Sequence, residues 1–220
     1  MSRKKRNKSK KRRALRRQGH SPEPMAPGSL QIVSYNITFD AMEPVTKIPR
    51  AVNKQLVELH HLVHDNPEEA IPRLEALKDK YPNTPILYNY LSMAYSGVGD
   101  TEKSDALARE NYRRNPGYLF AKVNYAEVCL QKGEYEEIPR IFDHKYDLKL
   151  LYPLRDEFHV SEVVGFMGII GTYFAEIEEF ETADRYYQIL EELDPDHPIT
   201  TRLGVKLMLH NIEKLFGSSH

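Results

Sequence analysis

Short breaks that contain proline interrupt the helical segments of this chain at a regular interval, and this interval is the strongest constraint on its fold. The breaks "DKYPNTP" and "RRNPGY" contain Pro82 and Pro116, which are separated by one period of about 34 residues. The next break, "ELDPDHP", contains Pro195, which follows Pro116 by two further periods and eleven extra positions. A period of this length, with a helix, a turn and a helix inside it, is typical of a helical repeat array.

The residues inside each period resemble the pattern of the tetratricopeptide repeat (TPR) family. That pattern has a large residue, a large–small pair and an aromatic residue on its first helix, then small and large residues on its second helix before a proline. The last copy of the pattern carries Met167, Ile170–Gly171, Phe174, Ala183, Tyr187, Leu190 and Pro195. The second copy carries Tyr88, Leu91–Ser92, Tyr95, Ser104, Ala108 and Pro116.

The other two copies match the pattern less completely. The third copy keeps Tyr125–Ala126 and Phe142, but it has Ile138 at a small position and Pro139 early in its second helix. The first copy matches in its second helix alone, "NPEEAIPRLEALKDKYP", and its first helix has Glu58 at the small position. We therefore predict three fair repeats and one degenerate repeat over residues 51–196, with eleven extra residues between the third and fourth copies.

A further helix is predicted after Pro195, because Asp196 is a good N-cap and Pro198 fits the first turn. Its apolar residues recur at helical spacing at Ile199, Leu203, Leu207, Ile212 and Leu215. Repeat arrays need a terminal element with a polar outer face. We expect this helix to be the solvating end of the array.

The predicted fold class is all-α, a TPR-like solenoid of three to four repeats with a C-terminal capping helix and a disordered basic N-terminal tail. Residues 1–29 lack the apolar content to fold alone. Residues 30–50 contain "LQIVSYNITF", which predicts an extended segment or a short strand. Residues 51–216 form the predicted repeat domain.

The N-terminal tail carries a dense positive charge. Residues 1–17 hold eleven basic residues and no acidic ones, and the rest of the chain has 20 Lys and Arg against 32 Asp and Glu, a net charge of −12. The basic residues are Arg3, Lys4, Lys5, Arg6, Lys8, Lys10, Lys11, Arg12, Arg13, Arg16 and Arg17. Such an arm fits a polyanion such as RNA or DNA, a nuclear import receptor, a solvated tail, or a contact with the chain's own acidic body. Its lack of aromatic residues predicts low sequence specificity, and its few apolar residues argue against membrane binding.

The resemblance to the TPR family implies a concave surface, lined by the first helices, that binds a protein or peptide. The predicted lining residues are Leu59, Val63, Ile86, Asn89, Met93, Phe120, Val123, Glu127, Leu130, Gly165, Gly168 and Thr172. Chaperone-binding members of the family use a clamp of Lys, Asn and Arg for a carboxylate, and Asn89, Lys122 and Asn124 do not reproduce it.

Gly165 and Gly168 are unusual residues for a helix, because each costs about 1 kcal/mol relative to alanine. They predict a close neighbour on that face of the helix. The neighbour is either the chain's own residues 30–50 or its end helix, or else a partner peptide.

No catalytic signature is present in the sequence, so we predict a non-enzymatic protein without a cofactor. His60 and His64, with Asp65, have a spacing that can hold a metal. The alternative is that His61 packs in the core while His60 and His64 face solvent or the N-terminal strand. The single cysteine, Cys129, takes the place of a repeat aromatic and is expected to be buried and inert.

We expect a cytoplasmic protein, or a nuclear one if the host has a nucleus. The arm is not followed by an apolar signal region, and the longest apolar run, residues 163–175, is shorter than the roughly 20 residues of a membrane span. The predicted function is that of an adaptor with a peptide groove and a cationic arm. The alternative is an RNA- or ribosome-associated protein in which the repeats act as a spacer.

Overall fold

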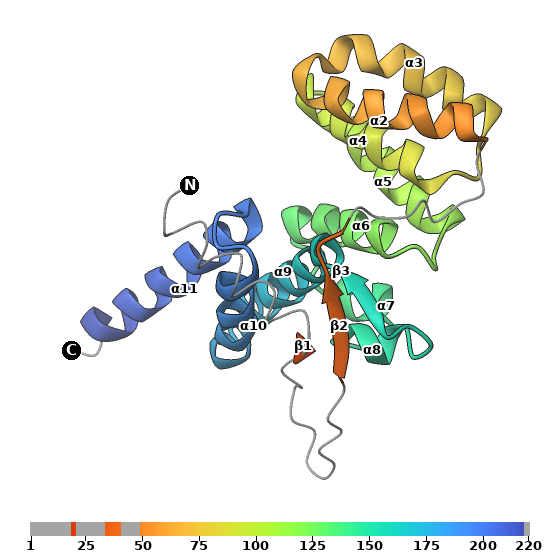
Figure 1. Cartoon of the computed structure of the whole chain (residues 1–220). Helices are drawn as coiled ribbons and strands as arrows, with labels where there is room; N and C mark the ends of the chain where they lie inside the picture. Colours follow the sequence, from red (N-terminus) through yellow and green to blue (C-terminus); the bar gives the residue numbers. More distant parts are fainter. Residues whose placement is uncertain (1–18, 21–33, 41–48, 218–220) are drawn as a thin grey trace, which may run out of the picture. The chain divides into compact units, whose positions relative to one another are not determined.

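A computed structural model describes residues 19–20, 34–40 and 49–217 of the chain (Figure 1). The predicted basic arm, most of the linker and parts of residues 30–50 lie outside the described residues. The chain divides into two compact units, which are treated separately below. Unit 1 combines Met1–Ala41 with Gly133–His220, and unit 2 is Met42–Lys132.

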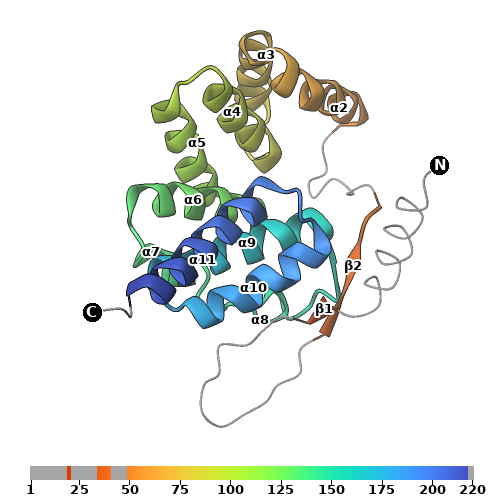
Figure 2. The ribbon, with the colours of Figure 1, turned by 90° about the vertical axis from the view of Figure 1, so that its left-hand side faces the viewer.

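Unit 2 consists of consecutive helices that pack in pairs (Figures 1 and 2). They are α2 (Arg50–Asp65), α3 (Pro67–Lys80), α4 (Pro85–Gly97), α5 (Thr101–Arg114) and α6 (Leu119–Lys132). Each helix contacts the next one along the chain, and the first helices α2, α4 and α6 also contact one another in sequence order. Contact between successive first helices is the arrangement expected of stacked repeats.

The predicted repeat period sets the ends of these helices. Asn66 caps α3 by accepting a hydrogen bond from the backbone N–H of Glu69 at 3.3 Å. Asp100, at the equivalent position of the next repeat, caps α5 by accepting from the backbone N–H of Lys103 at 3.1 Å. Helices α3 and α5 have 14 residues each. The caps satisfy backbone donors that a helix leaves unpaired at its start, so they define where each second helix begins.

Unit 1 contains a small sheet. One of its strands lies within residues 30–50, where an extended segment or a short strand was expected, whereas the partner strands were not part of the all-α prediction. Strand β2 (Ser34–Thr38) pairs antiparallel with β1 (Gly19–His20) and parallel with β3 (Glu157–His159). Ile37 lies opposite Phe158 in the register, and both side chains are buried. The ring of Tyr35 also meets Phe158 edge-on, with centroids 5.0 Å apart. Strand β3 lies in the eleven-residue insertion, so the insertion pairs with a segment more than a hundred residues earlier.

The second helix of the third repeat is broken into two short pieces, α7 (Glu137–Ile141) and α8 (Leu148–Leu151). Ile138 is fully buried although the repeat pattern has a small residue there. After α7, Asp143 and His144 both adopt a positive φ, at 53° and 55°, which no right-handed helix can continue through. The departures from the repeat pattern at Ile138 and Pro139 therefore coincide with a real interruption.

The fourth repeat and the end helix complete unit 1. They are α9 (Val160–Glu176), α10 (Phe180–Leu193) and α11 (Pro198–Gly217). All three helices contact one another. The predicted small residue Gly171 lies where a Cβ would come within 2.7 Å of Leu203 on α11 and 2.9 Å of Tyr186 on α10. A side chain at this position would push the three helices apart.

Candidate functional site

Two predicted groove residues on α2 face the interior of unit 2. Leu59 is 1% exposed and Val63 is 4% exposed. Both belong to the apolar core of the unit, together with Leu74 of α3 and Leu91 of α4. The prediction that Leu59 and Val63 line a groove is therefore wrong. In the degenerate first repeat, the apolar stripe of α2 packs inward against α3 and α4.

Asn89 forms part of a hydrogen-bond network between helices. Its Oδ1 atom accepts from Nδ2 of Asn111 on α5 at 2.7 Å and from Nδ2 of Asn124 on α6 at 3.0 Å. The buried Asn111 also donates to the Pro85 carbonyl at 3.0 Å. These contacts give Asn89 a structural role that joins three helices, and buried polar groups need such partners.

The glycine-rich face of α9 is covered by the end helix of the chain. A Cβ on Gly168 would lie 2.5 Å from Cδ1 of Ile199 on α11. Thr172 is 6% exposed, so it too is buried. Of the two alternatives for this face, the internal one is confirmed, and Gly168 is an internal packing site. Gly165, which precedes it on the same helix, is half-buried.

Five side chains on α4 and α6 keep partial exposure at equivalent repeat positions, and we name them the α4–α6 face. They are Ile86, Tyr90, Met93, Phe120 and Glu127. On α4, residues 86, 90 and 93 have the spacing of one helix side, and positions 120 and 127 are the equivalents of 86 and 93 in the next repeat. Met93 is 38% exposed, whereas Val123 and Leu130 of α6 are each 8% exposed. Four of these five residues were predicted from the sequence. Tyr90 was missed because the TPR pattern does not single out its position.

The α4–α6 face is bordered by a histidine of α2. The rings of His60 and Tyr90 have centroids 5.6 Å apart. Burial lowers the pKa of His60, and the nearby His64 and His61 lower it further. Burial raises the pKa of Tyr90. The lowered pKa of His60 favours the neutral imidazole, which suits a surface that contacts apolar side chains.

The metal alternative at His60, His64 and Asp65 receives no support from the geometry. The expectation that His61 packs in the core is wrong, because His61 is exposed. Within residues 19–20, 34–40 and 49–217, no group of three or more His, Cys, Asp or Glu side chains is placed to hold a metal ion. Cys129 is fully buried, as predicted. None of the helices described here is long and apolar enough to cross a membrane.

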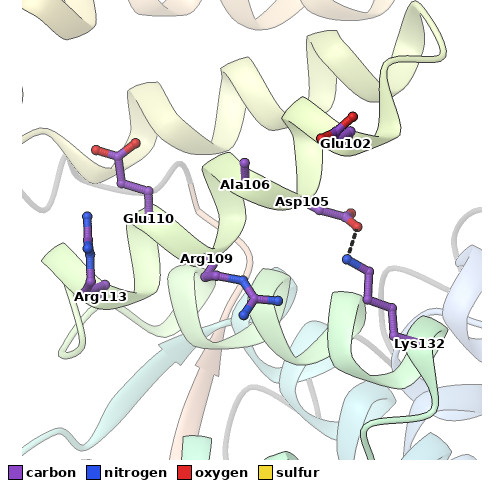
Figure 3. A pocket seen from close by; sticks show the side chains of 7 residues that line it. All are labelled: Glu102, Asp105, Ala106, Arg109, Glu110, Arg113 and Lys132. Carbon is purple, nitrogen blue, oxygen red and sulfur yellow. Dashed lines mark ion pairs between the residues drawn. The ribbon is translucent and has the colours of Figure 1, made fainter.

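An open hollow of about 480 Å³ lies on α5 beside the end of α6 (Figure 3). Its lining residues are Glu102, Asp105, Ala106, Arg109, Glu110, Arg113 and Lys132. Lys132 pairs with Asp105 at 2.7 Å, and the Arg109 guanidinium lies 5.3 Å from the ring centre of Tyr125. Three acidic and three basic side chains line the hollow, so it offers no concentrated charge of one sign for a small ion.

Successive helix pairs, first-helix contacts and caps at equivalent repeat positions together decide the architecture. The chain has a TPR-like fold. No family model matches the sequence, and no curated protein matches it. Nine chains of solved structures match, among them one titled "MamA RS-1 ArsTM double mutant". That match covers 73% of this chain and 95% of the other, at 16% identity and a TM-score of 0.46, so the fold assignment depends on the helix pairs of this chain.

Proposed function

We propose that this TPR-like protein is a non-enzymatic scaffold that binds a protein or peptide partner on its α4–α6 face. The observation that carries the proposal is the recurrence of partly exposed side chains at equivalent positions of two neighbouring first helices. Ile86 and Phe120 are one such pair, and Met93 and Glu127 are another. Because α4 and α6 contact each other, these positions form one surface within unit 2.

The chemistry of the face suits an apolar or amphipathic peptide. Tyrosine, phenylalanine and methionine are enriched in protein interfaces, and large side chains in partly buried positions lose little further freedom on binding. Methionine also adapts its shape to different partners. The single acidic residue at the edge, Glu127, favours a partner segment that carries a basic residue beside its apolar ones.

A displayed random-peptide library selected against the full chain tests the proposal. We expect enriched peptides with two or more large apolar residues, and we expect Met93→Glu to weaken their binding at least tenfold, because it places a charge in the contact. Leu154→Glu is the matched control, since Leu154 is 97% exposed and belongs to unit 1, whereas the face belongs to unit 2. The proposal fails if no peptide is enriched or if both variants bind equally well.

The segregation of charge along the chain favours a second candidate function, polyanion binding by residues 3–17. We propose that this arm binds RNA without sequence preference, independently of the α4–α6 face. Binding of a labelled oligouridine should weaken steeply with salt, with a slope of log K against log salt of up to about −8 if all eleven cations contact phosphates. Deleting residues 1–17 should abolish this binding and leave helical circular dichroism unchanged. Binding that survives the deletion would refute the candidate.

A further inference from the structure

Helix α11 is apolar on two opposite sides. Its inner side carries Ile199, Leu203 and Leu207, which are at most 8% exposed. This side faces unit 1, because Ile199 lies against Gly168 and Leu203 against Gly171, both of α9. The inner side accounts for three of the five apolar residues predicted for the stripe of the end helix.

The outer side of α11 carries a second and more exposed apolar stripe. Its members are Val205 at 47%, Met208 at 53%, Leu209 at 52%, Ile212 at 41%, Leu215 at 74% and Phe216 at 75% exposure. They recur at intervals of three and four residues, so they lie along one side of the helix. The predicted end helix is present, but its outer face is not the polar face of a solvating cap.

A helix that is apolar on all but its flanks is normally buried between two layers. At roughly 150–200 Å² for each large side chain, the outer stripe exposes roughly 500–700 Å², which reaches the upper limit for a monomer. The inner side already has its layer, α9 and α10. We therefore expect the outer side to be covered by a second apolar surface.

We propose that this layer is helix α11 of a second copy of the chain, packed antiparallel in a two-fold symmetric dimer. The charged residues beside the stripe favour a second α11 as the partner and an antiparallel orientation of the two helices. Lys206 and Glu213 are two helical turns apart, so they border the same edge of the stripe. An antiparallel pair centred between them places Lys206 of each copy opposite Glu213 of the other. A parallel pair places neither beside its opposite charge.

The contacts that α11 makes within its own chain are compatible with the antiparallel dimer. Lys206 pairs with Glu176 of α9 at 2.6 Å, so its ammonium group already lies at the border between the inner and outer sides. His210 stacks on Phe180 of α10, with centroids 3.5 Å apart, and belongs to the inner side. Glu213 is exposed. The Lys206 ammonium group can therefore bind a second carboxylate without leaving the first.

The size of the stripe sets the strength expected of the dimer. Two copies together bury roughly 1,000–1,400 Å², the lower end of the range for specific interfaces. We therefore expect a dissociation constant in the micromolar range, with monomer and dimer in exchange. The interface uses the same residues on both copies, as two-fold symmetry requires. It does not involve the α4–α6 face or residues 3–17.

Sedimentation equilibrium of the full chain over a wide concentration range measures the association. We expect the mass to rise from 25.6 kDa towards twice that value. Leu209→Asp should remain a monomer with unchanged circular dichroism, because Leu209 is half-exposed within its own chain. Val57→Asp, which places the same charge on α2, should dimerise like the wild-type chain. A wild-type chain that stays monomeric at hundreds of micromolar overturns the proposal, as does equal dimerisation by both variants.

Cysteine crosslinking tests the direction of the pair, and the buried Cys129 can remain in place. In the proposed register, residues 209 of the two copies lie at nearly the same level, whereas residues 216 lie about 20 Å apart at a rise of about 1.5 Å per residue. A disulfide needs Cα atoms closer than about 7 Å. Leu209→Cys should therefore form a crosslinked dimer on mild oxidation, and Phe216→Cys should not. Equal crosslinking by both variants would exclude the antiparallel pair.

Discussion

Gly168 of α9 lies so close to Ile199 of α11 that a Cβ on Gly168 would come within 2.5 Å of the Ile199 Cδ1 atom. Two further atoms of Ile199, Cγ2 and Cγ1, would lie at 2.6 and 2.7 Å. Gly168 therefore allows α11 to pack closely against α9 of the fourth repeat. A residue that the sequence offers as a binding position acts instead in the assembly of unit 1.

Gly168→Ala is expected to destabilise the protein by about 1–3 kcal/mol, because Ile199 must move or the helices must separate. The gain in helix propensity, about 1 kcal/mol, offsets only part of this cost. Urea unfolding measures the change. The double variant Gly168→Ala with Ile199→Val should recover part of the loss. Gly117→Ala is the control, because a Cβ there meets no atom within 4 Å. A Gly168→Ala variant as stable as Gly117→Ala would contradict the close packing.

Asn89→Ala is expected to cost about 1–3 kcal/mol, because it leaves the buried amide of Asn111 and the amide of Asn124 without their shared acceptor. Chemical unfolding of the full chain measures this loss. Gln55→Ala on the exposed side of α2 serves as the comparison and should change stability by less than about 0.5 kcal/mol. If the two variants unfold at the same urea concentration, the hydrogen-bond network of Asn89 contributes nothing to stability.

Because of the ion pair between Arg155 and Glu162, replacing Arg155 alone should reduce stability more than replacing both residues. Arg155 donates to Glu162 Oε1 at 3.0 Å and to Oε2 at 2.8 Å, and the Glu162 side chain is 6% exposed. Arg155→Met leaves the buried Glu162 carboxylate without its ion-pair partner, although the backbone N–H of His159 still donates to Oε2 at 3.0 Å, and the variant should cost about 2–4 kcal/mol. Arg155→Met combined with Glu162→Leu should recover most of that loss. Thermal unfolding of the wild type, the single variant and the double variant measures this recovery. A double variant less stable than Arg155→Met would refute the prediction.

Alkaline pH should destabilise the fold through its buried tyrosines. Burial raises the pKa of Tyr146 and of Tyr152 to about 12. The hydrogen bond from the Tyr95 hydroxyl to Glu75 raises the pKa of Tyr95 to about 12, and burial adds to the effect. The unfolded chain loses these protons near pH 10, so the folded chain holds more protons between about pH 10 and pH 12. The free energy of unfolding should therefore fall as the pH rises through this range.

Urea midpoints measured at several alkaline pH values, with tyrosinate absorbance recorded in parallel, test this dependence. Stability should be insensitive to these tyrosines below about pH 9. Tyr95→Phe should flatten the alkaline loss in part, because it removes one of the three groups. Tyrosinate that forms near pH 10 before any unfolding would show that the tyrosines are not held in their protonated form.

Local signals explain why the helices of the repeats could be predicted. Asn66 and Asp100 act as N-caps through hydrogen bonds that reach three positions along the chain, and the prolines at positions 82 and 116 end each pair within a few residues. Such interactions depend on neighbours in the chain, so they can be recognised in the sequence without knowledge of the packing. The same holds for the charge of residues 1–17.

The side that each residue faces could be predicted less well. Leu59 and Met93 are both apolar residues on first helices, yet the first is 1% exposed and the second 38% exposed. Their difference depends on how α2 and α4 rotate against their neighbours, and the degenerate first repeat gives no marker for that rotation. The broken second helix of the third repeat is an intermediate case, because Ile138 and Pro139 mark the departure but not its form.

The sequence by itself determined the helical repeat, its period and the separation of a cationic arm from an acidic body, because these properties arise from neighbouring residues and from composition. Only the tertiary structure decided that Ile37 pairs with Phe158 across more than a hundred residues, that Ile199 covers Gly168, and that α11 turns a second apolar side outward. These relations depend on which distant surfaces meet, and many pairs of apolar segments in the chain could satisfy the same local pattern.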